Sequence, residues 1–137
     1  MFIGNRETPF SIEKTLKEVV VDLLEKHTIE CFYVGNHGNF DSIVKNVLEN
    51  LISDGWQIRY VIVLAYIAES KNLKNTLYPQ EVAKSIPKYR IAKRNSWMLK
   101  ECDFVISYVK RSGVSKELCK RAERKGKRVI NLADFKS

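Results

Sequence analysis

The segment Arg94–Glu117, RNSWMLKECDFVISYVKRSGVSKE, decides the predicted fold. Its pattern is that of the end of a helix, a buried strand, a loop and the start of another helix. In an open α/β sheet, ligands bind where the carboxyl ends of strands lead into loops and helix N-termini. Residues 1–6 (MFIGNR) and 31–41 (CFYVGNHGNFD) likewise place a glycine-bearing loop after an apolar strand. We therefore predict that three loops converge on one polar site.

Composition bounds the class of protein. The 137 residues are 45% hydrophobic and 29% charged, which is typical of a soluble globular protein. No apolar run approaches the length of a membrane span, and the N-terminus begins almost directly with a strand rather than a signal peptide. The cysteines, Cys31, Cys102 and Cys119, form no CxxC pair. We predict a single cytoplasmic domain over residues 1–137 with reduced thiols and no membrane contact.

The order of the elements predicts the architecture. Apolar strands begin at Phe2 and cover residues 31–34, 60–66, 104–109 and 128–132, with helical patterns between most of them. Residues 67–88 lack periodicity and are expected to form a long excursion over the strand ends. Right-handed βαβ crossovers cover both faces of a parallel sheet. The prediction is an α/β fold, Rossmann-like and three-layered (α/β/α), with a five-stranded, mainly parallel, doubly wound sheet in the order 3-2-1-4-5.

Two glycine-bearing loops supply the first part of the predicted site. Glycine lets the backbone approach a ligand, and Arg6 is suited to a bidentate phosphate contact. Asp41 is expected to cap the following helix, whose dipole lies behind the loop. Glycine turns, an exposed arginine and an aspartate cap explain the same residues without a ligand. The predicted ligand-binding residues here are Gly4, Asn5, Arg6, Gly35, Asn36, Gly38 and Asp41.

The third loop and the helix before it complete the site. Ser112 or Ser115 is expected to cap the next helix. His37 has no companion His or Cys at metal-ligand spacing, so neither a metal nor a cofactor is predicted. The predicted ligand-binding residues of this part are Asn95, Lys110, Arg111, Ser112, Gly113 and Ser115.

Charge is unevenly distributed along the chain. Residues 1–69 contain six Lys or Arg and ten Asp or Glu, whereas residues 70–137 contain 18 and six, a balance of +12. A basic half indicates an anionic partner, either a phosphate-bearing small molecule or nucleic acid. A solvated cationic face is the alternative.

The three segments together closely resemble the SLOG superfamily of Rossmann-like nucleotide-binding domains. This superfamily includes the LOG phosphoribohydrolases and the DNA-processing protein A family. The likeness is carried by FIGNR, FYVGNHGNFD and RNSWMLKECDFVISYV, and is closest to small bacterial SLOG domains of uncharacterised function. The resemblance implies a nucleotide-like ligand and self-association as a homo-oligomer, most simply a dimer.

The LOG pattern also implies candidate catalytic residues. Arg94, Met98 and Asp103 keep the spacing of the LOG arginine, methionine and aspartate. Counting on without a gap, Gly113 and Glu117 match the last glycine and the glutamate of PGGxGTxxE. In LOG enzymes the arginine and the glutamate are the catalytic pair that cleaves the N-glycosidic bond of a nucleoside monophosphate. The resemblance therefore implies that Arg94 and Glu117 are catalytic.

The chain also departs from the LOG pattern. Lys110 and Arg111 replace the two glycines that let phosphate approach the backbone, and Val114 replaces the threonine. Two long cations would bind phosphate through their side chains instead. Nucleotide recognition is therefore better supported than hydrolysis.

Plainer roles remain open for both candidate catalytic residues. Glu117 is also explained as a first-turn helix residue paired with Arg121, and Arg94 as a surface arginine that packs on Trp97. Three functions follow as alternatives. The chain binds a nucleotide and either hydrolyses its glycosidic bond or only senses it, or it binds nucleic acid, or it is a non-catalytic interaction module.

Overall fold

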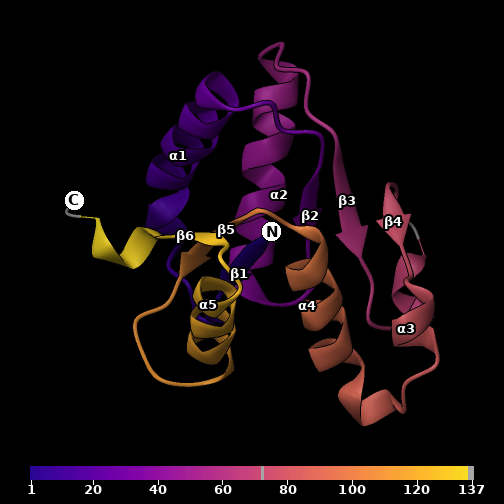
Figure 1. Ribbon diagram of the computed structural model, residues 1–137. Coiled ribbons are helices and arrows are strands. Elements are labelled where there is room, and N and C mark those ends of the chain that lie inside the picture. Colours follow the sequence, from indigo (N-terminus) through magenta and orange to yellow (C-terminus); the bar gives the residue numbers. More distant parts are fainter. Residues whose placement is uncertain (72, 136–137) are drawn as a thin grey trace.

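The computed structural model describes residues 1–71 and 73–135, in which short parallel strands alternate with helices (Figure 1). The predicted α/β class is confirmed. The strands are β1 (Phe2–Gly4), β2 (Phe32–Val34), β3 (Tyr60–Val63), β4 (Thr76–Leu77), β5 (Phe104–Tyr108) and β6 (Arg128–Asn131). The α-helices are α1 (Glu13–Lys26), α2 (Gly38–Ser53), α3 (Gln80–Ala83), α4 (Arg90–Glu101) and α5 (Val114–Arg124). Short 3₁₀ turns are η1 (Phe10–Ile12), η2 (Ile67–Ser70), η3 (Pro87–Tyr89) and η4 (Leu132–Asp134).

The prediction of one five-stranded sheet is wrong. The described strands form two parallel three-stranded sheets, with the orders β1-β5-β6 and β2-β3-β4. The predicted neighbours are present within each sheet, because β1 pairs with β5, β5 with β6 and β2 with β3. What is missing is the pairing of β1 with β2, and what is added is the two-residue strand β4.

Residues of both β1 and β2 line one cavity. Its volume is about 280 Å³, and its lining includes Phe2 of β1, Phe32 and Tyr33 of β2, and the residues that precede the two strands, Met1 and Cys31. Side chains bridge the two sheets in place of backbone hydrogen bonds, since the Phe2 and Phe32 rings stack with centroids 5.8 Å apart. Both strands have only three residues, so few backbone hydrogen bonds are available to close the gap.

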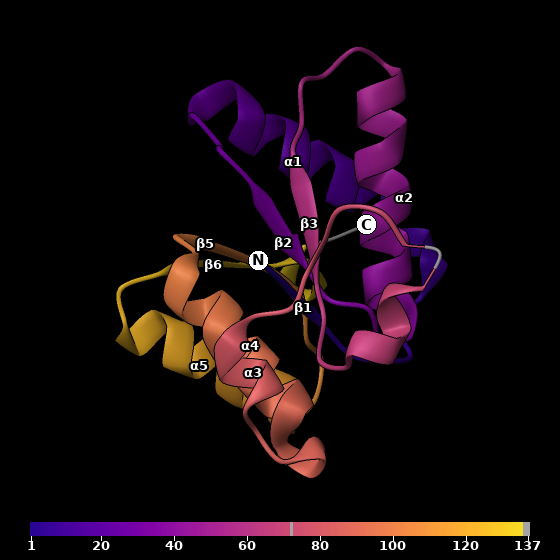
Figure 2. The same ribbon diagram turned by 90° about the vertical axis from the view of Figure 1, so that its right-hand side faces the viewer.

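Helices pack on both faces of the sheet β1-β5-β6 (Figures 1 and 2). Successive side chains of a strand point to opposite faces of the sheet, so the strand residues contribute to two apolar cores. Phe2, Ile106 and Tyr108 belong to the core that contains α1 and α2. Ile3 and Val105 belong to the core that contains α4 and α5. The two helix layers explain why β5 is buried on both sides.

The excursion predicted at residues 67–88 has structure of its own. It contains η2, β4, α3 and the start of η3, while Asn72 lies outside the described residues. β4 extends the second sheet by pairing with β3, so the excursion is anchored at the sheet edge. No helix in residues 1–71 or 73–135 combines the length and the apolar character that a bilayer crossing requires.

Helices α2 and α5 do not begin directly after the residues that were predicted to cap them. α2 begins at Gly38, so Asp41 lies within its first turn rather than before it. Gly113, not Ser112 or Ser115, precedes α5, and in the described part of the chain no side chain caps the start of that helix. With φ of +146°, Gly113 adopts a conformation that L-residues rarely reach, which explains the glycine there.

Candidate functional site

A pocket of about 480 Å³ lies where β1 and β2 end and α5 begins, with α4 along one side. It brings together members of all three predicted loops, namely Gly4–Arg6, Gly35 with Asp41, and Arg111 with Ser115. Its volume is within the usual range for small-molecule sites. The lining also includes the apolar residues Phe2, Ile3, Ile91, Met98, Val114 and Leu118.

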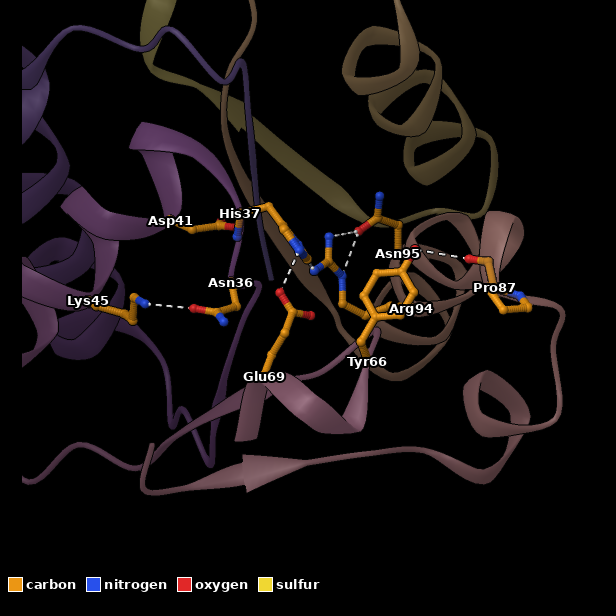
Figure 3. Close-up of polar contacts among 9 residues, drawn as sticks. All are labelled: Asn36, His37, Asp41, Lys45, Tyr66, Glu69, Pro87, Arg94 and Asn95. Atoms are coloured by element: carbon orange, nitrogen blue, oxygen red, sulfur yellow. Dashed lines mark hydrogen bonds and ion pairs between the residues drawn. The ribbon is translucent and has the colours of Figure 1, made fainter. Parts of the chain in front are cut away.

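Arg94 is the buried cation of this pocket. Only 4% of its surface is exposed, so it is not the surface arginine of the alternative prediction. Its Nε and Nη2 donate to Asn95 Oδ1 over 3.2 and 3.0 Å, and its Nη1 is 2.8 Å from His37 Nδ1 (Figure 3). Among the described residues, no carboxylate oxygen lies within 4.0 Å of the guanidinium. The pocket therefore holds a buried positive charge whose direct partners are an amide oxygen and an imidazole nitrogen.

The guanidinium keeps donor capacity for a ligand. Arginine carries five N–H donors and no acceptor. One N–H on each of Nε, Nη1 and Nη2 is used by the contacts to Asn95 and His37. Two N–H groups, one on each terminal nitrogen, have no acceptor within residues 1–71 and 73–135. Guanidinium N–H groups of this kind are suited to charge-assisted hydrogen bonds with a carboxylate or phosphate.

His37 and Glu69 extend this network away from the pocket. His37 directly precedes α2, and its Nε2 is 2.9 Å from Glu69 Oε2 (Figure 3). Glu69 belongs to η2, the first turn of the excursion. Its other oxygen, Oε1, is buried and has no hydrogen-bond partner in the described part of the chain. The excursion is thus connected to the candidate site by the carboxylate of Glu69, which contacts the imidazole of His37.

Asp41, in the first turn of α2, also contacts His37. Its Oδ2 accepts a hydrogen bond from the His37 backbone N–H over 2.9 Å. Burial raises the pKa of the Asp41 carboxyl above its usual value, although the His37 amide and the Arg94 guanidinium act in the opposite direction. Burial likewise lowers the pKa of Arg94, against Asp41 and Glu69, which raise it. Both charges are thus destabilised by desolvation more than their mutual attraction offsets.

Close packing requires glycine at two positions of the predicted loops. A Cβ on Gly35 would lie 2.7 Å from Asp41 Oδ2 and 3.4 Å from Arg94 Cζ. A Cβ on Gly4 would lie 2.3 Å from the Phe40 ring. Gly38 adopts φ of +81° beside the Arg6 backbone and is outside the pocket lining. Gly35 and Gly4 thus allow α2 to approach the strand ends.

The third loop forms the exposed rim of the pocket. Arg111 Nη2 pairs with Glu7 Oε2 over 3.0 Å, and both side chains are largely exposed. Ser115 donates to the Gly4 carbonyl over 3.3 Å, which joins α5 to the first loop. Lys110, Ser112 and Gly113 are exposed and do not line this pocket. Of the predicted residues in the loop, Arg111 and Ser115 reach the site.

Glu117 is outside the pocket lining. Its side chain is 69% exposed and lies 3.8 Å from Lys120, one turn along α5. The predicted pair with Arg121 is not formed, because Arg121 Nη2 donates to Ser96 Oγ over 2.9 Å. The geometry thus separates the two residues that the LOG pattern joins as a catalytic pair.

The predicted asparagines are engaged by protein groups. Asn5 Oδ1 accepts from the Lys110 amide over 3.3 Å, and Asn95 Oδ1 holds Arg94. Asn36 Oδ1 accepts from Lys45 over 3.0 Å and does not line the pocket. Asn5 and Asn95 line the site and fix its walls.

Sequence reasoning missed His37 and Glu69 as site residues. His37 carried a signal, because it lies between the two loop glycines, but a metal was the only role considered for it. Glu69 carried none, because its segment lacks periodicity. Among the described residues, no three His, Cys, Asp or Glu side chains gather closely enough to hold a metal ion.

Comparison with known proteins yields no match to any family model, curated protein or solved structure. The SLOG resemblance therefore depends on the spacing of the three motifs, and function has to be argued from the pocket.

Proposed function

We propose that this chain is a SLOG-type, Rossmann-like domain that binds a nucleotide or nucleotide-derived ligand in the Arg94 pocket. The observation that carries the proposal is the buried Arg94 guanidinium, with two N–H groups available and no carboxylate of residues 1–71 and 73–135 in direct contact. A buried unpaired charge is costly, and an anionic ligand would offset that cost.

The remaining lining suits the other parts of a nucleotide. The apolar residues Ile91, Val114 and Leu118 offer a surface for a base or ribose, and Val114 is 72% exposed at the pocket mouth. α5 starts at Val114, so its unpaired backbone N–H groups and its dipole favour an anion at this end. One polar wall and one apolar wall are typical of ligand pockets.

Binding is better supported than glycosidic hydrolysis. An oxocarbenium-like transition state needs a carboxylate near the sugar. Glu117 lies outside the lining, and the lining carboxylates Asp41 and Glu7 are engaged, Asp41 by the His37 amide and Glu7 by Arg111. The proposal is therefore a binding or sensing domain, without turnover.

Proton NMR of a nucleotide panel mixed with the protein tests this function. Line broadening of one nucleotide, with unchanged ribose anomeric signals, is the expected result. New signals of free base and ribose phosphate would instead establish a hydrolase. Unchanged spectra for every nucleotide of the panel would reject the nucleotide proposal.

Nucleic-acid binding is the second candidate because of one further observation. Residues 110–128 contain nine Lys or Arg and two Glu, a balance of +7. In α5 the apolar residues Leu118, Cys119 and Ala122 are buried, while Lys116, Lys120 and Arg124 are exposed. Counterion release makes such binding fall steeply with salt. A labelled oligonucleotide titrated at two salt concentrations tests it, and undetectable binding at low salt would reject it.

Self-association remains a proposal that follows from the SLOG resemblance. Light scattering coupled to gel filtration would give the mass in solution. A dimer would agree with the proposal, and a strictly monomeric species that binds nucleotide would count against it.

A further inference from the structure

We infer that His37 and Glu69 are positioning residues that hold the Arg94 guanidinium in the orientation that receives an anion. The inference rests on the proposed function, because it concerns the same pocket. It adds that the ligand affinity of the pocket depends on η2, a segment whose carboxylate reaches the pocket only through His37.

Donor and acceptor chemistry determines the state of the imidazole. A guanidinium only donates, so the 2.8 Å contact from Arg94 Nη1 requires His37 Nδ1 to be an acceptor. The proton of the neutral ring is then on Nε2, which lies 2.9 Å from Glu69 Oε2. Both contacts are satisfied together only by the neutral tautomer with the proton on Nε2. Glu69 therefore selects the tautomer that accepts from Arg94.

The network holds the guanidinium at both edges. Asn95 Oδ1 binds the edge formed by Nε and Nη2, and His37 binds Nη1. His37 is itself fixed at its backbone by Asp41 and at its ring by Glu69. With the plane fixed, the two remaining N–H groups keep constant directions, and a preorganised site loses less entropy when an anion binds.

If Glu69 acted through its charge alone, it would weaken anion binding, whereas a positioning role strengthens it. Glu69 is close enough to Arg94 to influence its pKa, so its carboxylate repels an anion in the same pocket. If Glu69 acted only through charge, any neutral replacement would strengthen anion binding. If Glu69 positions His37, a replacement that keeps the acceptor and one that removes it must differ.

The experiment compares Glu69→Ala with Glu69→Gln. Glutamine keeps an acceptor for His37 Nε2–H and removes the charge, whereas alanine removes both. The probe is inorganic pyrophosphate, measured by titration calorimetry, because it tests the Arg94 site without a base. We expect Glu69→Ala to weaken binding about 5- to 10-fold, the effect of losing about one hydrogen bond, and Glu69→Gln to retain it within about twofold or tighten it.

Imidazole ¹⁵N NMR without ligand gives the second readout. The chain has two histidines, His27 and His37, so a His27→Gln variant assigns the spectrum. We expect the Nε2–H tautomer for His37 in the wild type and in Glu69→Gln, and a mixture of tautomers in Glu69→Ala. A merely structural role for Glu69 would not separate the two variants in this way.

The outcomes distinguish this inference from the proposed function. Equal pyrophosphate affinity in the wild type and both variants, tighter binding in both variants, or no pyrophosphate binding to the wild type would overturn the positioning role. Pyrophosphate binding that responds to Glu69→Ala, with no nucleotide bound from the panel, would overturn the nucleotide proposal and leave the positioning role intact.

Discussion

The α4 side and the α5 side of the pocket are built differently although one continuous motif encodes both. On the α4 side, Arg94 is buried and held by Asn95 and His37. On the α5 side, Arg111 and Glu117 are exposed and make surface ion pairs with Glu7 and Lys120. Exposed ion pairs contribute little, whereas a buried, hydrogen-bonded cation is fixed before a ligand arrives. The difference indicates that binding energy is concentrated at Arg94.

Replacing the two arginines gives the largest expected contrast. Arg94→Ala should weaken nucleotide binding by at least about 100-fold, since it removes charge-assisted hydrogen bonds worth about 3 kcal/mol. Arg111→Gln should change affinity by less than about threefold. Calorimetry measures both, and circular dichroism checks that Arg94→Ala is folded. Arg94→Lys keeps the charge without the fork and should lose about tenfold. Equal losses in Arg94→Ala and Arg111→Gln would contradict the contrast.

Two glycines provide the next contrast. Gly35→Ala places a methyl group 2.7 Å from Asp41 Oδ2 and should lower both ligand affinity, by about tenfold, and the free energy of unfolding, by about 1–3 kcal/mol. Gly113→Ala meets nothing within 4 Å but adopts φ of +146°. It should cost stability through backbone strain while leaving affinity within about twofold. Urea unfolding and calorimetry separate these effects, and intact affinity in Gly35→Ala would refute the α4-side account.

From the buried Asp41 carboxyl on the α4 side, we predict that the free energy of unfolding depends on pH. Its pKa is raised from 3.8, so above that pH the folded state binds more protons than the unfolded state. The contribution of Asp41 to the free energy of unfolding therefore falls as pH rises from 3.8 through the folded-state pKa. Urea unfolding at several pH values should show the stability of Asp41→Asn, relative to the wild type, increasing over this window. A constant difference would contradict the raised pKa.

Glu117 gives the smallest expected effect. Glu117→Gln should change nucleotide affinity by less than about twofold and the free energy of unfolding by no more than about 0.5 kcal/mol, because the side chain is exposed. The same titration and unfolding measurements apply. A large loss of binding or of turnover would restore the catalytic pair that the LOG pattern implies.

The sequence predicted the class of fold and the convergence of the loops for clear physical reasons. Apolar strands and periodic helices fix the α/β alternation, and parallel strands bring their carboxyl ends to one edge. The gap between β1 and β2 was not predictable, because it depends on how Phe2 and Phe32 pack across two short strands. The contact of Gly4 with the Phe40 ring was also not predictable, because only the packing of α2 brings that ring to the end of β1.

Some residues of the site were predictable from the sequence, and others were not. Arg94 followed from motif spacing and Asp41 from its place after a glycine-bearing loop, but their burial depends on tertiary packing. Glu69 lies in a segment without periodicity, and only the fold brings it to His37. Glu117 was favoured by spacing alone, and the position of α5 turns its side chain toward Lys120.

The most direct test of the central claim is the ¹⁵N–¹H spectrum of the arginine guanidinium groups, recorded with and without the nucleotide that the panel identifies. Arg94→Lys and Arg111→Gln variants assign the two sets of signals. The account predicts that the Arg94 Nη signals shift and exchange more slowly when ligand is bound, while those of Arg111 change little. Unchanged Arg94 signals at saturating nucleotide would contradict it.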